Sequence, residues 1–94
     1  MAIFGEFRFP KGDPTALEAS GLSEVGCRIF TINTFPLGTL FRGVFFLYGE
    51  EVSVEGHVTR TVYQQEMTVR FTKVSPEGTA LIRAWRKRAR TLAV

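Results

Sequence analysis

The stretch Glu51–Val62, EVSVEGHVTRTV, has valines on one parity and Glu, Ser, His and Thr on the other. The side chains of a β-strand point to opposite faces in turn, so one face of such a segment is buried and the other faces solvent. Period-two patterning over twelve residues is a strong indication of a strand. The segment therefore predicts one long strand, with these residues on its buried face: Val52, Val54, Val58 and Val62.

Similar segments lie on both sides of this strand. Residues 39–48 precede it and end at Gly49-Glu50, which is typical of a hairpin turn. Residues 66–74 follow a turn at 63–65 and alternate again, which places Met67, Val69 and Phe71 inward. The pattern thus predicts three consecutive antiparallel strands joined by short turns.

The N-terminal part of the chain is also extended. Residues 2–9 end in an alternation typical of a half-buried strand, and residues 10–14 hold two prolines and a glycine, which indicate a loop. A second extended segment is expected at about 17–31, where Gly21 and Gly26 bracket a bend or bulge. In all, the patterns predict five or six antiparallel strands. A small closed barrel would remove the exposed edges of such a sheet.

The periodicity changes at Ser75-Pro76-Glu77, which suits the start of a helix. Serine is a good N-cap, proline fits the first helical position, and a glutamate is favourable at the positive end of the helix dipole. Gly78 stands where a capping box needs Glu or Gln, so the cap is half made. The expected helix, about 76–92, docks on the barrel through an apolar stripe. That stripe consists of Leu81, Trp85, Ala89 and Leu92, with Ala84 beside it, and Leu81, Trp85 and Leu92 are the expected anchors.

Composition sets the class of protein. The 94 residues are 45% apolar and 22% charged, which predicts one globular domain over 1–94, with strands at about 2–74. The longest apolar run, residues 44–48, is too short to cross a membrane. The single Cys27 cannot form an intramolecular disulfide, and no signal peptide is visible, so we expect a cytoplasmic protein.

The basic residues are concentrated near the C-terminus. Five of the twelve lie in residues 83–90, a stretch without an acid, whereas the rest of the chain holds nine acidic and seven basic residues. The helix dipole favours cations at this end, but it accounts for only one or two of them. We therefore expect one face of the helix to dock an acidic surface of a partner protein. This basic helix face consists of Arg83, Arg86, Lys87 and Arg90.

Catalysis is not expected. His57 is the only histidine and lies on the outward parity of its strand, and Cys27 is the only cysteine, so neither has a partner for nucleophilic or metal chemistry. The chain also has no glycine-rich phosphate loop with a lysine. The sequence therefore predicts no enzyme, no catalytic residue, no metal site and no cofactor.

Four stretches, in this order and spacing, resemble the PilZ domain family over roughly residues 3–92. They are GLSEVGCRI at 21–29, PLGT at 36–39, VEGHVTR at 54–60 and VRFTKVSPE at 69–77. The resemblance implies a six-stranded antiparallel β-barrel with one C-terminal helix. Such domains are typically receptors for the bacterial messenger cyclic di-GMP. Members of the family hold cyclic di-GMP with an Arg-x-x-x-Arg switch before the first strand and an Asp/Asn-x-Ser-x-x-Gly motif in the second strand.

The chain departs from both family motifs. Gly21 replaces the Asp or Asn, while Ser23 and Gly26 remain, and no Arg-x-x-x-Arg precedes the first strand. The expected function is thus an adaptor in motility, pilus or surface-attachment signalling that binds a protein, with weak or no affinity for cyclic di-GMP.

Two alternatives are a cyclic di-GMP receptor with a non-standard site and a nucleic-acid-binding barrel. Because the barrel body is mildly acidic, nucleic acid is not an expected partner. The residual ligand site, if used, would consist of Gly21, Ser23, Gly26 and Arg28, with Arg8.

Overall fold

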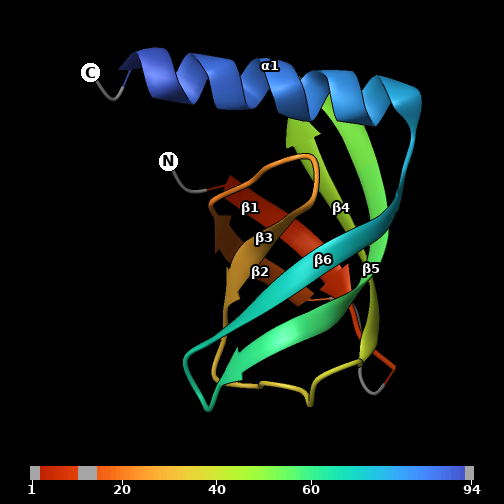
Figure 1. The fold of residues 1–94 in the computed structure, drawn as a ribbon, viewed down its shortest axis with the longest axis vertical. Helices are drawn as coiled ribbons and strands as arrows, with labels where there is room; N and C mark the ends of the chain where they lie inside the picture. The colour runs from red at the N-terminus through yellow and green to blue at the C-terminus, as the bar shows by residue number, and fades with distance from the viewer. Residues whose placement is uncertain (1–2, 11–14, 93–94) are drawn as a thin grey trace.

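The computed structural model describes residues 3–10 and 15–92, with side chains as far as Arg88. Six strands close into an antiparallel barrel in the order β1-β2-β3-β6-β5-β4, and one helix lies across an end of it (Figure 1). This confirms the expected fold class. The elements are β1 (Ile3–Arg8), β2 (Thr15–Ser20), β3 (Gly26–Phe30), β4 (Leu40–Leu47), β5 (Glu50–Val62), β6 (Glu66–Val74) and α1 (Pro76–Leu92).

The long strand predicted from its valines is β5, which pairs with β4 along one edge and with β6 along the other. Val52, Val54 and Val58 are buried, as expected, whereas Val62 at the end of the strand is only half-buried. Its pairing with β6 shifts register at Glu55/Gly56 and again between Val58 and Arg60. Such irregularities bend a strand and increase its twist, which helps a six-stranded sheet close on itself.

The hairpin between β4 and β5 turns one residue earlier than expected, at Tyr48 and Gly49. Both residues have positive φ, 54° and 76°. A two-residue turn with both φ values positive matches the right-handed twist of the flanking strands. The tight turn holds Tyr48 at the barrel end that the helix covers.

The expectation of one extended segment at 17–31 is wrong. The chain forms two separate strands there, β2 and β3, joined by a loop over residues 21–25. Gly21 starts this loop with a φ of 63°, a left-handed conformation that glycine adopts without a Cβ penalty. The two glycines therefore bracket a chain reversal, and β3 pairs with β2 on one side and β6 on the other.

The barrel interior is filled largely by aromatic and branched side chains. Phe41 lies near Phe7 and Phe71, with ring centroids 6.2 and 6.4 Å away. Phe9 stacks on Phe35 at 4.6 Å, beyond the end of β1. The largest fully buried side chains are Phe7, Phe45, Ile29, Leu47, Met67, Ile82, Val52, Val54, Val58 and Val69.

Helix α1 begins as the sequence predicts. The Ser75 hydroxyl accepts a hydrogen bond from the Gly78 N–H at 3.0 Å, and the Ser75 carbonyl accepts one from the Thr79 N–H at 2.8 Å. A Cβ on Gly78 would lie 3.1 Å from methyl groups of both Val52 and Val74. Glycine at this position therefore lets the first turn of the helix approach the barrel, and it also leaves the capping box incomplete.

The anchors of the helix differ in part from the expected set. Ile82 is completely buried, whereas Leu81 and Trp85 are half-buried against the core and Ala84 is exposed. The side chains of Ala89 and Leu92 lie outside the described residues. Among the described residues, α1 crosses the barrel end mainly over β4 and β5, and Ile82 is its buried side chain there. The Trp85 ring meets Tyr48 edge-on at 6.2 Å instead of entering the core.

Candidate functional site: the motif loop and the basic surfaces

The motif loop, residues 21–26, carries the serine and glycines of the residual ligand motif. The Ser23 N–H donates to the Gly26 carbonyl at 2.9 Å, and its hydroxyl donates to the same oxygen at 3.4 Å. That hydroxyl also accepts from the Val25 N–H at 3.3 Å. Ser23 is thus the residue that closes the loop, and its only hydroxyl hydrogen is used there.

Gly26 is explained by strand packing. It is buried at the start of β3, opposite Arg70 of β6, and an added Cβ would overlap the Val69 carbonyl oxygen. On the other side of β6, a Cβ added to Gly56 of β5 would overlap the Arg70 carbonyl oxygen in the same way. Glycines on the neighbouring strands therefore let β6 lie close to both, which is a requirement of the barrel and not of a ligand.

Gly21 supplies no side-chain hydrogen-bond acceptor where the motif has a carboxylate or amide. A Cβ built on it would have one neighbour within 4 Å, Arg28 Nε at 3.8 Å. An acidic side chain at this position would therefore lie beside the Arg28 guanidinium. In this chain the guanidinium pairs with no described carboxylate and remains exposed.

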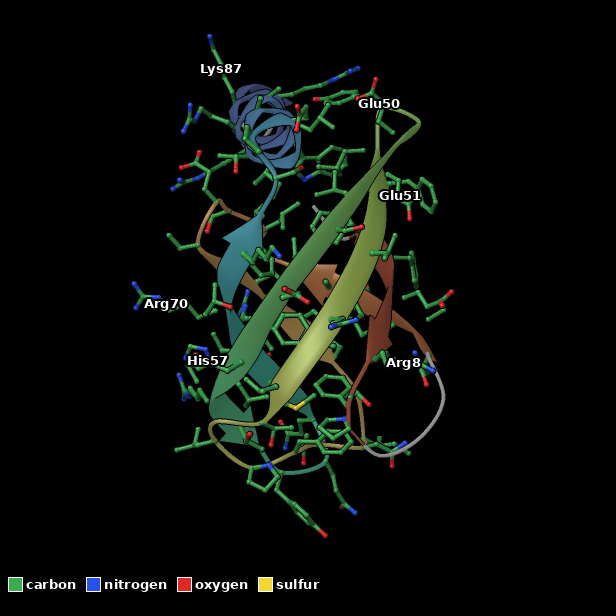
Figure 2. The ribbon with its side chains drawn as sticks, turned by 90° about the vertical axis from the view of Figure 1, so that its right-hand side faces the viewer. Arg8, Glu50, Glu51, His57, Arg70 and Lys87 are labelled. Atoms are coloured by element: carbon green, nitrogen blue, oxygen red, sulfur yellow. The ribbon has the colours of Figure 1, made fainter. Side chains whose placement is uncertain are left out.

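Arg28 belongs to a basic surface whose residues come from three strands, and the sequence did not predict that they lie together. Arg28 and Arg60 flank Thr68 on β6 from the two neighbouring strands, and Arg70 lies opposite His57. We call these residues of β3, β6 and β5 the Arg wall. Figure 2 shows Arg70 and His57 on the same side of the barrel. A hollow of about 360 Å³ at the wall has Gly21, Ser23, Arg28, Thr59, Thr68 and Arg70 among its lining residues, together with apolar residues such as Val25 and Val69.

The Arg wall can bind anions. Arginine donates in a planar fork that matches phosphate or carboxylate oxygens, and here the guanidinium groups are exposed beside hydroxyl groups. The outward parity of Arg70 was visible in the sequence. Its place beside Arg28 was not, because that depends on the pairing of β3 with β6, strands far apart in the chain.

The structure does not bring Arg8 to the motif loop. Arg8 pairs with Arg42 across β1 and β4 and lines a different hollow, of about 630 Å³, with Phe9, Leu40 and Glu55 among its other residues. Figure 2 shows Arg8 on the opposite side of the barrel from Arg70. Arg8 and Arg28 therefore cannot hold one small ligand together in this conformation.

The basic helix face is partly engaged by the protein itself. Arg83 Nε contacts Glu24 Oε1 at 3.3 Å, an ion pair that ties α1 to the motif loop. Arg88 lies over the Tyr48 ring, 6.0 Å from its centroid. Arg86 and Lys87 are exposed, and Lys87 points away from the barrel in Figure 2. The Arg90 side chain lies outside the described residues.

The residues that could support catalysis are placed unfavourably. Cys27 is buried, and burial raises the pKa of its thiol to about 12, which keeps it protonated and unreactive at neutral pH. His57 is half-buried on the outer wall of β5. In the described part of the chain, no group of three or more His, Cys, Asp or Glu residues could hold a metal ion. Likewise, no described helix is both long enough and apolar enough to span a membrane.

Comparisons with known proteins agree with this architecture. The family model described as "PilZ domain" matches residues 4–87. The crystal structure of the PilZ domain of CeSA, from a cellulose-synthesizing bacterium, superposes with a TM-score of 0.67 at 15% identity. The match covers 87% of this chain and 86% of that one. A comparison with curated proteins found no match.

Proposed function

The chain belongs to the PilZ domain family, and we propose that it acts as an adaptor that works through protein contacts without holding cyclic di-GMP in the usual way. Membership makes it a binding or adaptor module of cyclic di-GMP-linked signalling. The pathway that we propose is motility, pilus function or surface attachment in the bacterial cytoplasm, where this messenger is used.

The motif loop carries this proposal. The two motif residues that remain have structural duties: Ser23 closes the loop, and Gly26 permits the contact with Val69. The residue that would accept hydrogen bonds from a guanine edge is replaced by Gly21. A ligand would lose charge-assisted bonds of about 1.5–3 kcal/mol each, and each such loss weakens affinity about tenfold or more.

Calorimetric titration with cyclic di-GMP tests this proposal. We expect no saturable heat at ligand concentrations of about 50 μM, because position 21 offers no side-chain acceptor and the Ser23 hydroxyl hydrogen is already used within the loop. Tight, saturable binding that Ser23→Ala abolishes would contradict the proposal, since it would place a working site on the motif loop.

The second candidate, a cyclic di-GMP receptor with a non-standard site, is favoured by the Arg wall. Arg28 and Arg70 could receive the two phosphates without any help from Arg8. Saturable binding that survives Ser23→Ala but is lost in an Arg28→Ser, Arg70→Ser double variant would support this candidate. Arg42→Ser is the matched control, because Arg42 lies on another wall in an ion pair with Glu55 at 3.0 Å.

The surface that we propose for the protein partner is the exposed part of the basic helix face. Arg86 and Lys87 are exposed on the described part of α1, and Lys87 points away from the barrel in Figure 2, so both side chains can meet an acidic surface. Arg83 is less suitable for testing, because reversing its charge would also break its contact with Glu24. Electrostatic attraction at such a face mainly raises the association rate.

Affinity capture from the source bacterium, followed by mass spectrometry, tests this surface. An Arg86→Glu variant should keep its melting temperature and lose a partner that the wild-type protein captures. Arg60→Glu, on the Arg wall, is the control and should keep that partner. Retention of the same partner by the helix variant would place the docking surface elsewhere.

A further inference from the structure

Two phenylalanines are exposed side by side on the wall opposite the Arg wall. Phe4 of β1 is 72% exposed and Phe46 of β4 is 66% exposed. The strands pair with Gly5 opposite Phe45 and Glu6 opposite Val44, so the next step of this register places Phe4 opposite Phe46. Both rings point away from the core, because their neighbours in sequence are the buried positions.

The outer neighbours of these rings are acidic. Phe4 pairs with Glu18 of β2, and Phe46 pairs with Glu51 of β5. One row across four strands therefore has a carboxylate at each end and two aromatic rings between them. Figure 2 shows Glu51 on the outer side of β5, below the hairpin tip with Glu50.

The adjacent row continues this surface. Glu6 and Val44 are opposed across β1 and β4, and Ala16 lies opposite Glu6 on β2. A hollow of about 350 Å³ lies between the two rows, with Phe4, Phe46, Val44 and Glu51 among its lining residues. We call this surface the Phe patch: Phe4, Glu6, Ala16, Glu18, Val44, Phe46 and Glu51.

Folding does not explain the Phe patch. Exposed aromatic rings gain little from burial, and contiguous apolar surface rimmed by charge is typical of interaction sites. None of Glu6, Glu18 and Glu51 forms an ion pair with a described residue, although Arg42 and Arg83 pair with other acids. The carboxylates are thus available to a partner.

We propose that the Phe patch docks a basic amphipathic segment of a partner protein, in which apolar side chains fill the hollow and flanking Lys or Arg side chains meet the three glutamates. Charge complementarity selects this occupant. An isologous contact between two copies would set glutamates against glutamates, and an anionic lipid surface would be repelled. The barrel is closed, so the segment binds through side chains and not by adding a strand.

The Phe patch extends the adaptor function beyond the basic helix face. The two surfaces carry opposite charge and use different elements: the Phe patch lies on β1, β2, β4 and β5, and the basic helix face lies on α1. One small barrel could therefore bind an acidic partner and a basic partner together. The inference does not depend on whether cyclic di-GMP binds, because no residue of the Phe patch belongs to the motif loop.

The probe for the test is a fluorescent amphipathic peptide of leucine and lysine, with a matched peptide of leucine and glutamate. Fluorescence anisotropy at moderate salt should show binding of the lysine peptide only. A Phe4→Thr, Phe46→Thr variant should bind about tenfold more weakly, as expected when central aromatic anchors are removed. Threonine keeps the strand preference at both sites, and a melting curve checks that the variant is folded.

Leu40→Thr is the matched control, because Leu40 is also an exposed apolar residue of β4, at 69%, near the opposite end of the strand. It should bind the lysine peptide like the wild-type protein. A Glu18→Lys, Glu51→Lys variant should lose the preference for the lysine peptide. Unchanged binding by the double Phe variant, or equal binding of both peptides, would overturn the proposal.

Sedimentation velocity tests the remaining occupant, a second copy of the chain. The wild-type protein should sediment as a monomer at tens of micromolar. Self-association that the double Phe variant abolishes would assign the Phe patch to a dimer and overturn the proposal of a basic partner.

Discussion

The motif loop and the Phe patch differ in how far folding accounts for their residues. In the motif loop, Ser23 and Gly26 look like remains of a ligand site, yet hydrogen bonding and strand packing explain both. In the Phe patch, no motif marks Phe4 or Phe46, yet nothing in the fold requires exposed rings there. A retained motif residue is therefore weaker evidence of function than an exposed residue without a structural duty.

The largest effect should come from Gly26→Ala. The new methyl group would overlap the Val69 carbonyl oxygen, which is backbone and cannot rotate away, so β3 and β6 would have to separate. We expect a loss of about 3 kcal/mol in the free energy of unfolding, measured by urea denaturation. Val25→Ala, one residue earlier and exposed, is the control and should change it by less than about 0.5 kcal/mol. A stable Gly26→Ala variant would remove the structural explanation of this glycine.

Ser23→Ala should have a smaller effect. It removes the hydroxyl that bridges Val25 and Gly26 and leaves the backbone bond between Ser23 and Gly26 in place. We expect urea denaturation to show a loss of about 1 kcal/mol without any ligand. Ser53→Ala, on the exposed face of β5, is the matched control. If Ser23→Ala were as stable as the wild-type protein, the fold would not explain Ser23, and a role in ligand binding would be the better explanation.

Phe46→Thr should leave stability nearly unchanged. The ring is exposed, so its loss removes only a cross-strand contact, and we expect a change within about 0.5 kcal/mol. Differential scanning fluorimetry against wild type measures it. A loss of 2 kcal/mol or more would show that the ring stabilises the barrel, and the difference between the two regions would disappear.

Gly21→Asn should have the smallest effect. Asparagine tolerates the left-handed conformation of this position, and the space around it is open except for Arg28. The free energy of unfolding should therefore stay within about 0.5 kcal/mol of wild type. A large loss in thermal denaturation would mean that the loop cannot accept the family residue, so that glycine is required by the fold.

The sequence predicted the parts of the fold that depend on local pattern. Alternation in 51–62 and 66–74 gave two strands, and Ser75-Pro76 gave the helix start. Local pattern gave a wrong prediction for residues 17–31. In the sequence alone, a glycine that reverses the chain in a left-handed conformation cannot be told from a glycine at a β-bulge. The helical spacing also did not identify Ile82 as an anchor, since the burial of each helical residue depends on where α1 crosses the barrel end.

The candidate surfaces were less predictable than the fold. Arg28 meets Arg70, and Phe4 meets Phe46, only through pairings between strands distant in sequence. Alternation shows that such side chains face outward, but it gives neither the order of the strands around the barrel nor their register. Closure of the barrel creates both surfaces, and it also places Arg8 on a different wall from Arg28.

The central claim is that the motif loop serves the fold and not a ligand. An NMR titration of the isotope-labelled protein with cyclic di-GMP tests it most directly, because it reports binding residue by residue. We expect the backbone amide signals of residues 21–26 to stay in place as the ligand reaches about 1 mM, well above the range of a useful messenger site. Saturable shifts centred on the Ser23, Val25 and Gly26 amides would contradict it.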